Sequence, residues 1–133
     1  MTLSPNPADE EILCAVEAWI DDLSRGDFDS AYARTDHDRY YQWSPELMRS
    51  VIEGYGSPIF AEQKKKSSVT PRTLAMGGAP RRVVDRDATP PNSLAYVEYR
   101  LPLDGVWSDL SAAFRVEPRE GGSALVLEEI HVR

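Results

Sequence analysis

The chain has 133 residues and a mass of 14.9 kDa, the size of one domain with a single core. Its 15 Lys and Arg residues against 22 Asp and Glu residues give a formal charge of −7 and a pI near 4.8, which excludes a nucleic-acid-binding protein with a basic surface. The single cysteine, Cys14, excludes an internal disulfide and a cysteine-cluster metal site.

We therefore expect residues 1–133 to form one domain, with residues 1–7 as a flexible N-terminal arm. The stretch Met1–Glu11 is polar and acidic, unlike a secretory signal. Apolar runs stay well below the roughly 18 residues of a membrane span. These features predict a cytoplasmic protein with neither a membrane nor a nucleic acid as its partner.

Three helices are predicted in the first half of the chain, where apolar residues recur at three- and four-residue steps. Their ends are marked by Gly26 after the first helix and by Asp27 and Ser44 as N-caps. Pro45 suits the first position of the third helix. The expected ranges are Pro7 or Ala8 to Arg25, Phe28–Thr35, and Ser44-Pro45 to the glycines Gly54 and Gly56, with a short extended stretch over Arg39–Trp43.

The second half of the chain shows strand-type segments separated by glycine- and proline-rich turns. Short turns favour hairpins between consecutive strands, and the spacing of βαβ units is missing. The sequence therefore predicts an α+β fold with the helices on one face of a mostly antiparallel sheet. The expected strands are Val69–Met76, Arg81–Arg86, Leu94–Leu101, Val106–Val116 and Ala124–Val132.

Two stretches resemble the NTF2-like superfamily of cystatin-like cones, which includes SnoaL-type cyclases and ketosteroid isomerase. One is the segment Ala15–Tyr32, an amphipathic helix followed by the run Gly26-Asp27-Phe28, and the other is the closing run Leu125–Val132. The resemblance implies a strongly curved sheet around the first helix and a conical cavity that is open at one end. It also implies a homodimer through the outer face of the sheet. Because this superfamily hosts isomerases, dehydratases and plain binding domains, the resemblance indicates the fold better than the function.

Two groups of ionisable residues are candidates for catalysis. In Asp36-His37-Asp38, a histidine between two carboxylates could serve as an oriented general base, and the alternative is a solvated polar turn. Glu128 shares a strand face with apolar residues, where its pKa would rise and it could act as an acid or base. A bulge that exchanges the faces, or an arginine from a neighbouring strand, is the alternative there.

Aromatic rings are the candidate ligand-binding residues, because rings with a few polar tips form the walls of small-molecule pockets. The alternative is that the rings fill the core of a small domain. The six candidates are Trp19, Tyr32, Tyr40, Tyr41, Trp43 and Tyr55.

Three functions remain open for this chain. The first is an NTF2-like domain that binds a small apolar or amphipathic ligand in its conical pocket. The others are a small isomerase, cyclase or dehydratase that uses pocket carboxylates, and an acidic protein-interaction module. We expect neither a cofactor nor a metal ion, since the two histidines belong to no metal-binding or phosphate-binding motif.

Overall fold

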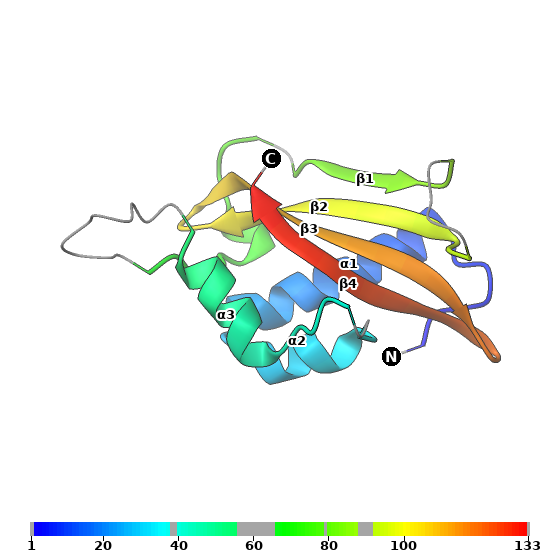
Figure 1. The fold of residues 1–133 in the computed structure, drawn as a ribbon. Coiled ribbons are helices and arrows are strands. Elements are labelled where there is room, and N and C mark those ends of the chain that lie inside the picture. Colours follow the sequence, from blue (N-terminus) through cyan, green and yellow to red (C-terminus); the bar gives the residue numbers. More distant parts are fainter. Residues whose placement is uncertain (1, 38–39, 56–65, 79, 88–91, 133) are drawn as a thin grey trace.

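The computed structural model describes residues 2–37, 40–55, 66–78, 80–87 and 92–132. Three helices lie on one side of a four-stranded antiparallel sheet in the order β1-β2-β3-β4 (Figure 1). This arrangement confirms the α+β class and the antiparallel meander. The elements are α1 (Asp9–Ser24), α2 (Phe28–Arg34), α3 (Pro45–Glu53), the 3-10 helix η1 (Arg72–Leu74), β1 (Arg82–Asp85), β2 (Ala95–Leu103), β3 (Val106–Arg119) and β4 (Gly122–Val132).

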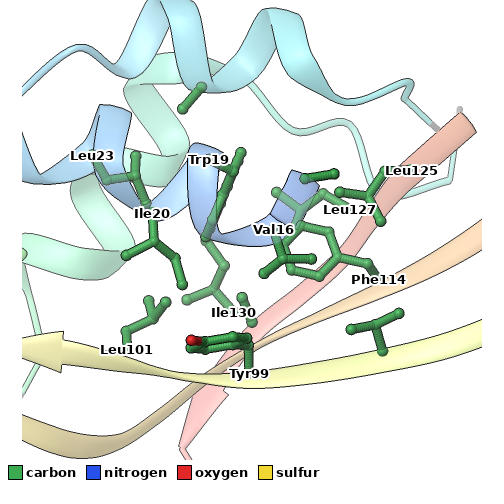
Figure 2. Close-up of a cluster of buried hydrophobic side chains, with 14 of the residues drawn as sticks. Val16, Trp19, Ile20, Leu23, Tyr99, Leu101, Phe114, Leu125, Leu127 and Ile130 are labelled. Atoms are coloured by element: carbon green, nitrogen blue, oxygen red, sulfur yellow. The ribbon is translucent and has the colours of Figure 1, made fainter. Parts of the chain in front are cut away.

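Helix α1 supplies the apolar stripe that covers the sheet. Its side chains point at residues of β2, β3 and β4 (Figure 2). The Trp19 ring meets the Phe114 ring edge to face, with the ring centroids 5.1 Å apart. Burial of each large side chain of this kind contributes about 1.5–3 kcal/mol. The fully buried residues of this layer include Ile12, Val16, Trp19, Ile20, Val97, Tyr99, Leu101 and Phe114.

The predicted helix ends are confirmed by the capping bonds. The Asp27 carboxylate accepts a hydrogen bond from the Ser30 amide at the start of α2. The Ser44 hydroxyl accepts one from the Leu47 amide at the start of α3, where Pro45 takes the first helical position. These side chains satisfy amides that have no partner within their own helix.

Two predicted extended segments are wrong. The segment Val69–Met76 contains η1 and touches the sheet only through single bridges, from Val69 to Leu103 and from Met76 to Val106. Pro71 lacks an amide donor for a strand ladder, and its carbonyl instead accepts from the Leu74 amide at 2.9 Å. Within 39–43, residues 40 and 41 form a turn, while residue 39 lies outside the described residues.

The N-terminal arm is attached to the sheet, which differs from the flexible arm expected for residues 1–7. Leu3 and Ser123 exchange two backbone hydrogen bonds of 2.8 Å, and the Leu3 side chain is buried. The Ser4 amide and hydroxyl donate to the Glu11 carboxylate at 2.8 and 2.6 Å. A single β-bridge thus attaches the arm to the start of β4.

Gly122 allows this attachment, because a Cβ atom there would lie 2.5 Å from the Leu3 carbonyl oxygen. We expect Gly122→Ala to displace the arm and to lower the free energy of unfolding by about 1–3 kcal/mol in urea denaturation. In a chain that lacks residues 1–4 the same substitution should cost much less. An equal cost in both chains would contradict this explanation.

Candidate functional site

The six candidate rings do not line one pocket. Trp19 is 0% exposed within the core, whereas Tyr40 is 84% exposed and meets Tyr41 edge to face at 5.1 Å. The remaining rings lie at separate places and each has its own partner. Tyr32 stacks on His37 with centroids 3.8 Å apart, the Trp43 indole N–H donates to the Glu128 carbonyl at 2.8 Å, and the Tyr55 hydroxyl donates to Asp109.

The space between α1 and the sheet is filled by core side chains. Trp19, Tyr99 and Phe114 are among the largest residues that lie fully buried there (Figure 2). The Tyr99 hydroxyl donates to the Glu17 carboxylate at 2.7 Å, and burial raises the pKa of Tyr99 to about 12. This hydroxyl therefore stays protonated near neutral pH and joins α1 to β2.

The Asp36-His37 pair anchors the end of α2. The Asp36 amide donates to the Leu125 carbonyl at 2.8 Å, and its carboxylate lies 3.0 Å from Arg119 Nε. His37 Nε2 lies 3.1 Å from the Tyr32 carbonyl oxygen. Burial lowers the pKa of His37, against the opposing effects of the Tyr32 carbonyl and of Asp36. The third candidate of this group, Asp38, lies outside the described residues.

Glu128 is the extra residue of a β-bulge. Leu127 pairs with Phe114 and Glu129 pairs with Ala113, so the register shifts at this point. Glu128 Oε1 lies 2.5 Å from Arg115 Nε on the neighbouring strand β3. The apolar environment expected for this carboxylate is therefore wrong, and both alternatives, the bulge and the arginine partner, are confirmed.

A chain of ion pairs connects Asp36 to Glu128. Arg119 lies 3.0 Å from Asp36 and 3.3 Å from Glu117, and Arg115 lies 2.9 Å from Glu117 and 2.5 Å from Glu128. Both carboxylates are thus ends of one network along β3. This network joins the loop after α2 to the last two strands.

A hollow of about 410 Å³ lies where α1 ends, α2 begins and α3 passes, and we call it the α1–α3 hollow. Its apolar lining comes from the edge of the core. Its polar lining comes from serines and from three charged side chains. The apolar residues are Leu23, Phe28, Ile52 and Val69, and the polar ones are Ser24, Arg25, Arg49, Glu53, Ser67 and Ser68.

Arg49 is the cation of this hollow without an acidic partner among the described residues. Its guanidinium lies over the Phe28 ring, 4.8 Å from the ring centroid. Arg25, by contrast, pairs with the buried Asp22. The Ser24 and Ser67 hydroxyls donate to the backbone carbonyls of Asp21 and Tyr55.

Sequence reasoning missed this site. Phe28 begins the second predicted helix, but the sequence gives no signal that α3 would place Arg49 above its ring. Val69 is far along the chain from Leu23 and Ile52, so the sequence does not reveal that the three residues line one hollow. In the described part of the chain, no group of three or more His, Cys, Asp and Glu residues could hold a metal ion, and no helix is long and apolar enough to cross a membrane.

The pKa of His37 predicts a pH effect on stability. Because this pKa is lower in the folded state than its usual 6.5, the unfolded state binds more protons as the pH falls. The free energy of unfolding of the wild-type chain should therefore fall, relative to that of His37→Gln, between about pH 7 and about pH 5. Urea denaturation of both chains across this range measures the difference, and the opposite trend would mean that the pKa is raised.

Comparisons of the chain with protein-family models, with curated proteins and with solved structures found no match. Membership of the NTF2-like superfamily therefore stays a prediction.

Proposed function

We propose that this chain is an NTF2-like ligand-binding domain that takes a small amphipathic anion in the α1–α3 hollow. The observation that supports this most is the combination of an apolar lining with Arg49, a cation that forms no ion pair with a described acid. An alkyl chain would cover the core side chains at the rim, and its anionic head would bind the guanidinium. Binding at this rim needs no rearrangement of the packed layer beneath α1.

An enzyme of the isomerase or cyclase type has less support. Asp36 and Glu128 are held by Arg119 and Arg115, and His37 stacks on Tyr32. A general base must reach a substrate proton, and a carboxylate that serves a structural ion pair is poorly placed for that role.

The acidic interaction module also has less support. Most of the acidic residues of α1 are paired within the chain. Asp9 pairs with Arg86, and Asp21 pairs with Arg72 at 2.9 Å. Such pairs neutralise the surface that would have to attract a basic partner. The homodimer implied by the resemblance stays a prediction for the outer face of the sheet.

Octanoate is the probe for the proposed site, with octan-1-ol as its uncharged counterpart. Titration calorimetry should show saturable binding of octanoate, and NMR should place the shifted amides at Leu23, Ile52 and Val69. Arg49→Gln should weaken octanoate binding about tenfold, because a charge-assisted hydrogen bond is lost. Binding of octan-1-ol should be nearly unchanged by the same substitution.

Arg86→Gln is the matched control, since it also removes one positive charge but lies away from the hollow, beside Asp9. This variant should bind octanoate as the wild type does. Ser68→Trp, which places a large ring in the lining, should abolish binding. If octanoate fails to bind, or binds Arg49→Gln as tightly as the wild type, the proposed function is wrong.

A further inference from the structure

Two arginines lie opposite each other on the face of the sheet that points away from α1. The Arg100 amide of β2 donates to the Arg81 carbonyl at 3.0 Å, next to the paired residues Val83 and Glu98. Like charges directly opposite in a sheet repel, so this arrangement costs stability unless an anion lies between them. Arg82 points to the other face, where it lies 3.4 Å from Glu17.

The lack of acidic partners makes this pair unusual within the chain. Neither Arg81 nor Arg100 forms an ion pair with any residue that the structure describes. Most other arginines in the same ranges do so, although acids outnumber cations in this protein. The paired arginines are Arg25, Arg34, Arg72, Arg82, Arg86, Arg115 and Arg119.

A buried hydroxyl lies beside the two guanidiniums. Ser111 of β3 pairs with Arg100 in the ladder and is 0% exposed. Its Oγ has no hydrogen-bond partner among the described residues. A buried hydroxyl without a partner is costly, and binding sites are one place where such groups are retained.

These groups share one hollow of about 250 Å³, which we call the outer hollow. It is lined by Arg81, Val83, Glu98, Arg100 and Ser111. Val83 is 52% exposed and offers an apolar wall. The hollow therefore combines two cations, a hydroxyl donor, one acid and one apolar surface, at a place separate from the α1–α3 hollow.

We propose that the outer hollow binds a small organic carboxylate. The planar guanidinium of Arg100 matches a carboxylate with two parallel N–H···O bonds, and the Ser111 hydroxyl supplies a further donor. The Glu98 carboxylate and the net charge of −7 penalise a dianion more than a monoanion. The organic part of the ligand packs on Val83. A singly charged carboxylate with a short apolar body therefore fits better than phosphate.

Benzoate is the probe, and inorganic phosphate is the dianion with which it is compared. In NMR titrations of the ¹⁵N-labelled full chain, benzoate should cause saturable shifts at the Arg81 and Arg100 side chains and at the Ser111 amide. Arg100→Gln should weaken benzoate binding about tenfold. Ser111→Ala, which leaves the charges unchanged, should weaken it several-fold, and phosphate should bind more weakly than benzoate.

Lys66→Gln is the matched control, because Lys66 is another cation without an acidic partner in the described part and is not in the lining. It should bind benzoate as the wild type does. The proposal is overturned if benzoate causes no saturable shift, if Arg100→Gln binds it unchanged, or if phosphate binds more tightly. It is also overturned if benzoate does not bind and Arg100→Gln weakens self-association in sedimentation, since the arginines would then meet carboxylates of a second copy.

Discussion

The packing of the α1 stripe on the sheet sets the position of every other feature. Trp19 lies against Phe114 in the middle of this contact, and Ile20 and Leu23 continue it toward the end of the helix. Because large side chains fill the layer, little room is left for a ligand between α1 and the sheet. Binding is then favoured at rims and faces, where core side chains or strand residues reach the surface.

Ion pairs hold the remaining segments onto this packed layer. Arg72 of η1 pairs with Asp21 of α1. The hydrogen bonds to the Asp21 carboxylate raise the pKa of Arg72, although burial acts to lower it. Glu17 accepts from Tyr99 and lies near Arg82, so it joins α1 to β1 and β2. Exposed pairs of this kind stabilise by less than about 1 kcal/mol each, but they fix which segment lies where. An arginine outside this pairing has its charge available for a ligand.

Features set by neighbouring residues were predictable from the sequence. The caps Asp27 and Ser44 and the hairpin glycines act through their own backbone surroundings, so the helices and four of the five expected strands were found. The fifth, over Val69–Met76, failed because Pro71 favours a turn over a ladder. The bulge at Glu128 depends on pairing with β3, and alternation along β4 alone could not reveal it. The candidate sites were harder still, because they join residues such as Phe28 and Arg49, or Arg81 and Ser111, through tertiary contacts.

Charged residues of one type stabilise the fold at some positions and are available to bind a ligand at others. The charges of the neighbouring residues distinguish these two roles. The Glu128 carboxylate forms an ion pair with Arg115 across the bulge, and the Trp43 indole donates to the Glu128 backbone carbonyl, so this residue is committed to the fold. Arg100 has the same charge as Arg115 and lies on the same sheet, but it faces Arg81 and the buried Ser111 hydroxyl. No described acid forms an ion pair with either arginine, although acids are abundant in the chain and Glu98 lies in the same lining. Two arginines that repel each other beside a buried hydroxyl, which has no partner among the described residues, destabilise the fold. A ligand that binds all three groups therefore explains this arrangement better than a structural role does.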